Sequence, residues 1–269
     1  MQYIIGFFIA LFIALTGVGA GTITVPVLVL FLGVPAPVAV GIGLTFSAAV
    51  KLILTPAQIA RRNVDWRTLG YMLLGGVPGV LVGSFLLKRL VSTGSANLLN
   101  AILGAILVTT ASWQIIHSLR RARQNSNPRD RSHLLAWLML PVGAEVGFSS
   151  AGAGALGSTA LLSLTQLEPA QVVGTDIVFG FLVSLIGSGA HWFGQGGNPE
   201  LLVQLIVGGV AGAIGGTLLS THIPRRPLRV ALCVWLLILG GQFLFNSFHV
   251  WAKAHSDADR EIPLVHHER

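Results

Sequence analysis

Two glycine-dense runs are the places where this sequence is best suited to bind a ligand. They read Thr16-Gly-Val-Gly-Ala-Gly-Thr22 and Ser149-Ser-Ala-Gly-Ala-Gly-Ala155, and each interrupts a long apolar stretch. Such a break leaves backbone N–H groups without helical partners, which a membrane tolerates where the backbone is buried in protein or lines a polar cavity. Helix N-termini at the break offer N–H groups and the positive end of a helix dipole to an anion. The runs therefore predict an anion site, with close helix packing as the alternative.

Hydroxyl groups and one lysine lie within or near these runs. Oxygens of an anion accept several hydrogen bonds, so clustered hydroxyl and amide donors would suit one. Lys51 lies near the middle of an apolar stretch, where its ammonium could be a buried counter-charge or could snorkel to the membrane surface. The candidate substrate-binding residues are Gly19, Gly21, Thr22, Thr24, Thr45, Lys51, Ser149, Ser150, Gly152, Gly154 and Thr175.

Three other ionisable residues lie in apolar stretches, where such residues are rare and often functional. Glu145 precedes the second glycine run and could carry a proton or pair with Lys51. Asp176 could carry a proton or cap the start of a helix. His191 lies near the end of a stretch beside Trp192, where a partnerless interfacial histidine is common. These three are the proton-coupling candidates, and no spacing typical of metal ligands or of a nucleophile and its base is recognisable.

The elements that must position these residues are apolar helices. Hydrophobic residues make up 53% of the 269 and charged residues 10%, with a mean hydropathy of +0.75, whereas about a quarter of a soluble domain is charged. Crossing a bilayer takes roughly 20 helical residues, and backbone groups in lipid must be satisfied within the helix. We therefore predict an all-α integral membrane protein, with apolar stretches over residues 2–32, 38–60, 69–87, 96–119, 134–167, 171–193, 201–219 and 228–251.

The chain consists of two copies of one unit. A shift of 133 positions places Gly19-Ala20-Gly21 on Gly152-Ala153-Gly154 without a gap. The same shift superimposes two glycine ladders whose small-xxx-small spacing is typical of close helix packing, not of a binding site: Gly75, Gly79 and Gly83 on Gly208, Gly212 and Gly216. We divide the chain into a first transmembrane repeat (1–119), an Arg-rich cytoplasmic linker (120–133), a second transmembrane repeat (134–252) and a polar tail (253–269).

Corresponding loops of the two copies differ in charge. Arg61, Arg62 and Arg67 lie in or beside a loop whose counterpart, residues 194–200, has no positive charge. Because cytoplasmic loops collect Lys and Arg, this favours copies inverted in the membrane, with both termini outside. Inversion requires residues 2–32 and 134–167 to be hairpins of two short helices, followed by three single crossings in each copy. A parallel arrangement stays open as the alternative.

The formal charge of +7 does not indicate nucleic-acid binding, because the Arg and Lys residues lie in the short connections between apolar stretches. The single cysteine, Cys233, excludes an internal disulfide. No Gly-x4-Gly-Lys-Ser/Thr loop is present, so we do not expect a self-contained ATP-driven pump.

Four short motifs occur in a fixed order: Val25-Pro26, Gly41-Ile-Gly-Leu-Thr45 with its counterpart Gly174-Thr-Asp176, Asn63-Val-Asp-Trp66 and Gly75-Gly-Val-Pro-Gly79. Their order and spacing resemble the sulfite exporter TauE/SafE family, also called the 4-toluene sulfonate uptake permease family. The resemblance covers both copies, from Phe7 to Phe245. The sequence departs from the family pattern in two places. The first copy reads Gly41-Ile42-Gly43 where the second reads Gly174-Thr175-Asp176, and the second copy has Asn198-Pro199 in place of the Asp-Trp pair. The resemblance therefore does not imply that both halves bind substrate equivalently.

The resemblance implies a secondary transporter in the bacterial inner membrane for small sulfur-containing anions such as sulfite or organosulfonates. Alternating access would come from one repeat rocking against the other. An anion channel for the same substrates is the first alternative, and a membrane-embedded enzyme is the second. No cofactor is expected, and the sequence does not indicate the anion, the direction of transport, the coupling ion or the oligomeric state.

Overall fold

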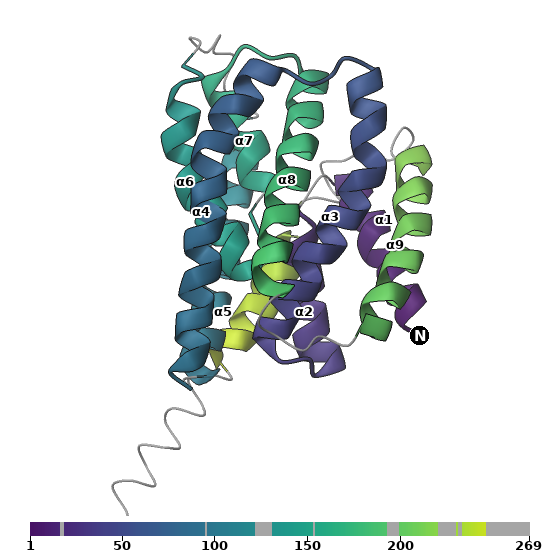
Figure 1. The fold of residues 1–269 in the computed structure, drawn as a ribbon, viewed down its shortest axis with the longest axis vertical. Helices are drawn as coiled ribbons and strands as arrows, with labels where there is room; N and C mark the ends of the chain where they lie inside the picture. Colours follow the sequence, from purple (N-terminus) through teal and green to yellow (C-terminus); the bar gives the residue numbers. More distant parts are fainter. Residues whose placement is uncertain are drawn as a thin grey trace, which may run out of the picture.

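The structure is a computed structural model of the chain. It describes residues 1–16, 19–94, 96–121, 131–152, 154–192, 199–219, 230 and 233–245, and within these ranges every regular element is a helix. The elements, shown in Figure 1, are α1 (Gln2–Thr16), α2 (Ala20–Leu32), α3 (Ala36–Ala60), α4 (Trp66–Ser92), α5 (Ala96–Arg121), α6 (Leu134–Ser149), α7 (Ala155–Leu164), α8 (Pro169–Trp192), α9 (Pro199–Leu219) and an unlabelled helix at Cys233–Phe245.

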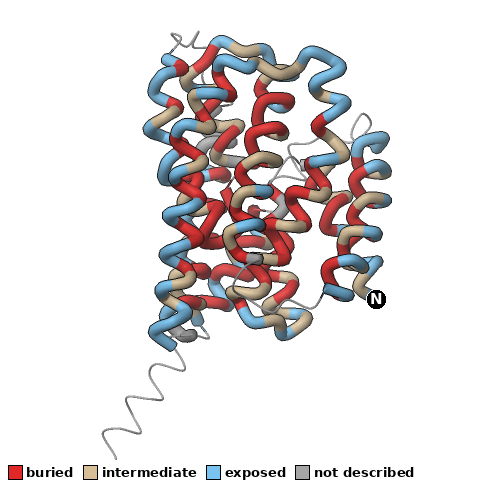
Figure 2. Tube along the Cα trace, viewed as in Figure 1, coloured by how far each residue is buried: buried red, intermediate tan, exposed pale blue. Residues whose placement is uncertain are grey.

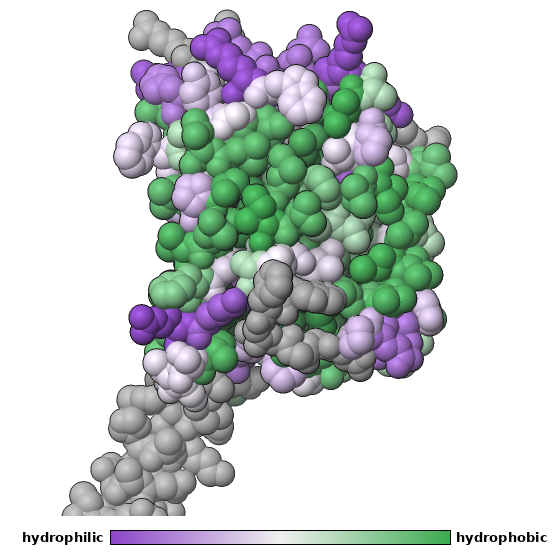
Figure 3. All heavy atoms as spheres, viewed as in Figure 1, coloured by the Kyte–Doolittle hydropathy of each residue, from purple (hydrophilic) through white to green (hydrophobic). Residues whose placement is uncertain are grey.

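Five of the described helices are long and apolar enough to cross a membrane. The five candidate spans lie in α3, α4, α5, α8 and α9. Figure 2 shows that exposed residues face outwards around the bundle while buried residues line its interior. The exposed residues include large apolar side chains such as Leu74, Phe85 and Leu218, and Figure 3 shows an apolar belt between hydrophilic bands at the two ends of the molecule. The protein is therefore a multi-pass membrane protein.

The two apolar stretches that contain glycine runs are each divided into two short helices. In the first copy α1 ends at Thr16 and α2 begins at Ala20; in the second α6 ends at Ser149 and α7 begins at Ala155. The helix breaks thus fall at the glycine runs, as predicted. Residues 17 and 18, most of the linker and the polar tail lie outside the described residues.

Helices α1 and α6 each pack on a helix from the other half of the chain. Helix α1 packs on α9, and α6 packs on α4. The glycine ladders form both contacts, because their missing side chains allow backbones to approach closely. A Cβ atom on Gly75 would lie 1.8 Å from the carbonyl oxygen of Ala136, and one on Gly208 would lie 1.9 Å from that of Tyr3. The two contacts are equivalent under the 133-residue shift, and the ladders are packing surfaces.

Helices α3 and α8 pair along their lengths at the centre of the bundle and run antiparallel (Figure 1). Two hydrogen bonds join them, Thr45 Oγ1 with Ser188 Oγ at 2.6 Å and Ser184 Oγ to Ser47 Oγ at 3.1 Å. The contacts follow opposite orders along the two helices: Thr45 of α3 pairs with Ser188 of α8, whereas the later residue Ser47 pairs with the earlier residue Ser184. The interface therefore carries a row of small polar side chains inside an apolar bundle.

Candidate functional site

The second glycine turn is held by hydrogen bonds of its own backbone and hydroxyl groups. Ser150 ends α6 in the left-handed conformation, with φ 62°, and its N–H donates to the carbonyl of Val146 at 2.8 Å. The Ser149 hydroxyl accepts from the N–H of Ala151 at 3.2 Å, and Gly152 also has a positive φ of 88°. Positive φ at two residues reverses the chain sharply, so the turn projects Ser150 towards the first copy.

Ser150 lies directly against the first copy. A Cβ atom on Gly21 would lie 1.8 Å from the Ser150 carbonyl oxygen and 2.2 Å from its Oγ, and one on Gly43 would lie 3.0 Å from the same Oγ. Only glycine leaves room at Gly21. The Ser150 hydroxyl is buried and has no hydrogen-bond partner among the described residues. We call this contact the Ser150–Gly21 junction, and its free hydroxyl can donate to or accept from a ligand.

Helix α2 begins at this junction without a side-chain cap. Its N-cap is Gly19, and no side chain hydrogen-bonds to the first turn there. The Thr22 hydroxyl donates to the Gly19 carbonyl, and Thr22 and Thr24 are fully buried. Helix α7 likewise follows Gly154 without a side-chain cap. Two helix N-termini therefore start inside the bundle, and the N–H groups of an N-terminus attract anions.

Lys51 is buried between α3 and α8, with 6% of its surface exposed. Its ammonium lies on the backbone of α8, since a Cβ atom on Gly180 would come within 2.0 Å of Nζ. Nζ makes no hydrogen bond within the described residues, and Asp176 is the acidic group that acts on it electrostatically. Lys51 is eight residues from Gly43 on α3, about 12 Å along the helix, so it lies apart from the Ser150–Gly21 junction.

Asp176 does not cap a helix. Helix α8 begins at Pro169, so Asp176 lies seven residues inside it and the N-cap interpretation is wrong. The polar segment Gly174-Thr175-Asp176 continues the helix and does not start it. Its Oδ2 accepts a hydrogen bond from the Ser158 hydroxyl of α7 at 2.7 Å. Asp176 is buried and connects α7 to α8.

Glu145 lies at the second glycine turn. Its Oε1 accepts a hydrogen bond from the Thr110 hydroxyl of α5 at 2.5 Å, and a Cβ atom on Gly152 would lie 3.0 Å from Oε2. The carboxylate thus folds back onto the turn, and the acidic group that acts on Lys51 is Asp176 instead. The Glu145 carbonyl also accepts from the Ser149 hydroxyl at 2.9 Å.

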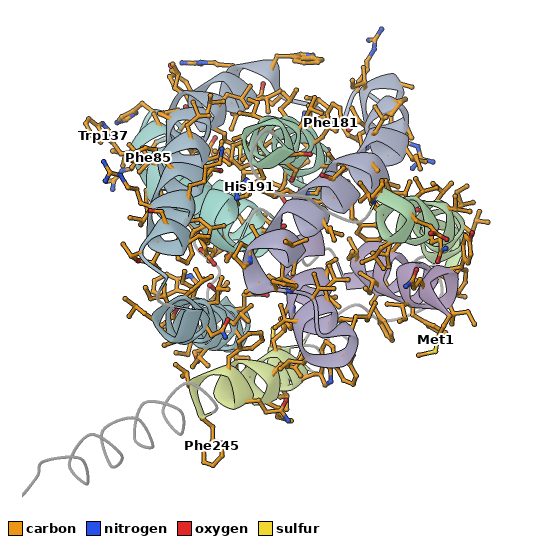
Figure 4. The ribbon with its side chains drawn as sticks, turned by 60° about the horizontal axis from the view of Figure 1, so that its bottom comes forward. Met1, Phe85, Trp137, Phe181, His191 and Phe245 are labelled. Atoms are coloured by element: carbon orange, nitrogen blue, oxygen red, sulfur yellow. The ribbon has the colours of Figure 1, made fainter. Side chains whose placement is uncertain are left out.

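His191 is buried in the bundle, not exposed at an interface, as Figure 4 shows. Only 2% of its surface is exposed, and its Nδ1 lies 2.9 Å from the carbonyl of Gly187. A Cβ atom on Gly41 would lie 3.5 Å from the His191 Cβ, an ordinary van der Waals contact, so α3 lies directly beside the His191 side chain. The position beside Trp192 was therefore misleading.

Thr45 and Thr175 lie away from the glycine turns. The Thr45 hydroxyl contacts the Gly41 carbonyl at 2.9 Å and Ser188 in the α3–α8 interface. The Thr175 hydroxyl accepts from the N–H of Asp65 at 3.0 Å, where it joins α8 to the start of α4. Of the predicted residues, the structure brings together Gly21 with the second turn and leaves Lys51, Thr45 and Thr175 outside that contact.

Sequence reasoning assigned no role to a set of small polar residues on α3, α7 and α8. These are Ser47, Thr55, Ser158, Ser184 and Ser188, of which all but Ser158 are buried. The sequence feature that could have identified these residues is the spacing of polar side chains within otherwise apolar stretches. Among the described residues no three His, Cys, Asp or Glu side chains form a group that could hold a metal ion.

Comparison with known proteins agrees with this architecture. The family model described as "Sulfite exporter TauE/SafE" matches residues 3–243. The chain is 27% identical over 246 residues to the "Probable membrane transporter protein YjnA" of Bacillus subtilis (strain 168), covering 88% of this chain and 96% of that protein. No solved structure matches the chain. On this match over nearly its whole length, the chain belongs to the sulfite exporter TauE/SafE family of membrane transporters.

Proposed function

We propose that the protein is a secondary transporter of small sulfur-containing anions, such as sulfite or organosulfonates, and that it binds them at the Ser150–Gly21 junction. The observation that carries this proposal is the buried Ser150 hydroxyl, which has no partner among the described residues and lies against the uncapped start of α2. The family description and the printed name of the B. subtilis relative support transport across a membrane.

The chemistry of the junction suits a sulfur oxyanion or sulfonate. Its oxygens accept several charge-assisted hydrogen bonds, and hydroxyl and backbone N–H groups can supply them without a full neutralising charge. A buried Lys51 on the adjoining helix α3 provides the positive charge along the same path. The proposed binding residues at the junction are Gly19, Gly21, Thr22, Thr24, Ser149, Ser150, Gly152 and Gly154, with Thr45 and Thr175 as more distant members.

We also propose that the repeats are inverted and that transport occurs by alternating access. Helices α3 and α8 correspond under the 133-residue shift, yet they pair antiparallel. Corresponding helices that run in opposite directions are what inverted repeats require. Rocking of one repeat against the other would then expose the site to each side of the membrane in turn.

The end of the molecule that carries the α3–α4 loop is assigned to the cytoplasm of a bacterial cell. Arg61 and Arg62 are exposed in this loop, and the hydrophilic band at that end is visible at the top of Figure 3. Arg131, at the end of the linker, donates its N–H to the carbonyl of Leu164 at the end of α7. An inner-membrane location with this end inside follows the positive-inside rule.

Coupling to protons is proposed to run through Glu145, with Asp176 and His191 as the other candidates. Glu145 is favoured because its carboxylate contacts the turn that carries Ser150. An anion at the junction and an ionised Glu145 would repel each other strongly in a medium of low dielectric constant. Binding of the anion would therefore favour the protonated carboxyl group and couple the two ligands.

A panel of ligands tests the proposal. Purified wild type would be titrated with sulfite, sulfate, taurine, sulfoacetate and an aliphatic carboxylate, followed by counterflow measurements in liposomes. Saturable binding of a sulfur anion together with counterflow supports a transporter. Non-saturable anion flux without counterflow would indicate a channel instead, and no binding of any sulfur anion by folded protein would remove the substrate assignment.

A further inference from the structure

The charges of Lys51 and Asp176 lie at the interface of three helices. Lys51 extends from α3 onto the backbone of α8 at Gly180, and Asp176 lies one helical turn before Gly180 on α8. The Asp176 carboxylate also reaches α7, where a Cβ atom on Gly157 would lie 2.2 Å from its Oδ1. Both side chains are buried, each with 6% of its surface exposed.

This charge pair has no counterpart in the other half of the molecule. The 133-residue shift places Gly180 on Ser47, and it places Lys51 on Ser184. Where the Lys51 ammonium lies over Gly180, the equivalent contact is the hydrogen bond between the Ser184 and Ser47 hydroxyls, at 3.1 Å. Asp176 falls on Gly43 in the same way. The Lys51–Asp176 pair therefore occurs at only one of the two contacts that the 133-residue shift relates.

A nearby negative group stabilises a buried ammonium. Removing one member of a buried pair leaves an uncompensated charge, which is strongly unfavourable in protein and in lipid. In this conformation Asp176 is the acidic group that acts on Lys51. An anion moving between α3 and α8 has the same sign as Asp176 and can take its place, whereas a neutral solute cannot.

We propose that Asp176 is the resident counter-ion of Lys51 and that the transported anion replaces it there during passage. This inference rests on the proposed function in one respect, namely that the substrate is an anion. Lys51 is then a second anion-binding site, about two helical turns from the Ser150–Gly21 junction. Asp176 occupies this second site while no anion is bound there. Asp176 thereby excludes neutral solutes.

A hydrogen-bond path connects the anion-binding site at Lys51 to the second glycine turn. The Ser158 hydroxyl lies 2.7 Å from Asp176 Oδ2 and 2.6 Å from the carbonyl oxygen of Gly154. A hydroxyl has one proton, so it fully donates to only one of these acceptors. When an anion replaces Asp176 at Lys51, the carboxylate moves and the Ser158 hydroxyl donates to the Gly154 carbonyl instead. Anion binding at Lys51 thereby changes a hydrogen bond at the start of α7.

The test compares Asp176→Asn, Lys51→Met and the double variant in purified full-length protein, by thermal unfolding and by titration with sulfite and sulfate. Asp176→Asn should unfold at a lower temperature than wild type, and the double variant should lose less than the sum of the two single changes. Sulfite should restore the unfolding temperature of Asp176→Asn and should bind it about tenfold more tightly than wild type, because it no longer competes with a carboxylate for Lys51; tenfold corresponds to about 1.4 kcal/mol. Neither effect should occur in the double variant.

Each other outcome points to a different error. Additive losses in the double variant would show that Lys51 and Asp176 do not act on each other, whatever the substrate. Coupled losses without any effect of anions on Asp176→Asn would overturn the replacement step, even if wild type binds sulfite. Absence of sulfite binding by wild type, with an intact charge pair, would count against the proposed function and not against the pair.

Discussion

The carbonyl and hydroxyl oxygens of Ser150 lie so close to Gly21 that a single methyl group on Gly21 would overlap both of them. The two residues belong to different repeats, and each lies beside a break in an apolar helix. Where they meet, a buried hydroxyl faces the first turn of a helix that has no side-chain cap. This relationship gives the first of five predictions.

Replacing Gly21 by alanine should abolish binding of sulfur anions. The added Cβ would lie 1.8 Å from the Ser150 carbonyl oxygen, so the turn must move away. Overpacking of this kind costs about 1–3 kcal/mol of stability, which thermal unfolding would measure beside the binding titration. Gly189→Ala is the matched control, since a Cβ atom there meets nothing within 4 Å. Equal binding by both variants would count against a site at the junction.

Replacing Ser150 by glycine should weaken anion binding without unfolding the protein. Glycine adopts the positive φ of 62° without strain, so the variant removes the hydroxymethyl side chain and keeps the backbone conformation. A hydrogen bond to a charged group contributes about 1.5–3 kcal/mol, which corresponds to roughly a tenfold to hundredfold rise in Kd. Isothermal titration with the anion that wild type binds best measures the change, and an unaltered Kd would exclude the hydroxyl from the site.

Replacing Glu145 by glutamine should uncouple transport from the pH gradient. The amide keeps the shape of the protonated carboxyl group and can still accept from Thr110, so anion counterflow should continue while accumulation driven by an imposed gradient is lost. Thr110→Val serves as a control that disturbs the hydrogen bond and leaves the carboxyl group in place. Gradient-driven uptake at the wild-type rate in Glu145→Gln would assign coupling elsewhere or to no proton at all.

Replacing Gly180 by alanine should destabilise the protein through Lys51. The new Cβ would lie 2.0 Å from Nζ, so the lysine must leave its position near Asp176. In the background of Lys51→Ala the same change should cost much less, because the side chain it displaces is gone. Unfolding temperatures of the two single variants and the double variant measure this compensation; equal losses in both backgrounds would place the Lys51 ammonium elsewhere.

The inverted arrangement predicts opposite exposure of two corresponding loops. In a Cys233→Ser background, Arg62→Cys should be protected from a membrane-impermeant thiol reagent added to intact cells, and Glu200→Cys should react. Both positions are exposed in the structure, so access depends on the side of the membrane and not on burial. Labelling of both cysteines, or of neither, from outside would favour a parallel arrangement.

The helices and their breaks could be predicted because both depend on local composition. Apolar stretches define the spans, and the glycine runs define where α1 and α6 end. Contacts between residues far apart in the chain could not be predicted in this way. The shift of 133 positions related Lys51 to Ser184, but only the antiparallel pairing of α3 and α8 reveals that Lys51 lies at Gly180, near Asp176.

His191 shows why a local pattern can mislead. Its position beside Trp192 at the end of an apolar stretch is typical of a membrane interface. Burial of its ring follows from the packing of α8 on α3, a contact between residues far apart in the chain. Likewise, the predicted pairing of Glu145 with Lys51 assumed that two rare charges meet, whereas Glu145 has a nearer partner in the Thr110 hydroxyl of α5.

The exchange of partners between the repeats has a consequence for biosynthesis. Helix α6 finds its partner α4 already made when it leaves the ribosome, but α1 packs on α9, which is synthesised much later. During this interval the α1 backbone that α9 will cover faces lipid or the insertion machinery. A ribosome that stalls before α9 thus leaves a chain whose first helix has no partner. The first helix of the chain therefore reaches its final contacts only after α9 has been inserted.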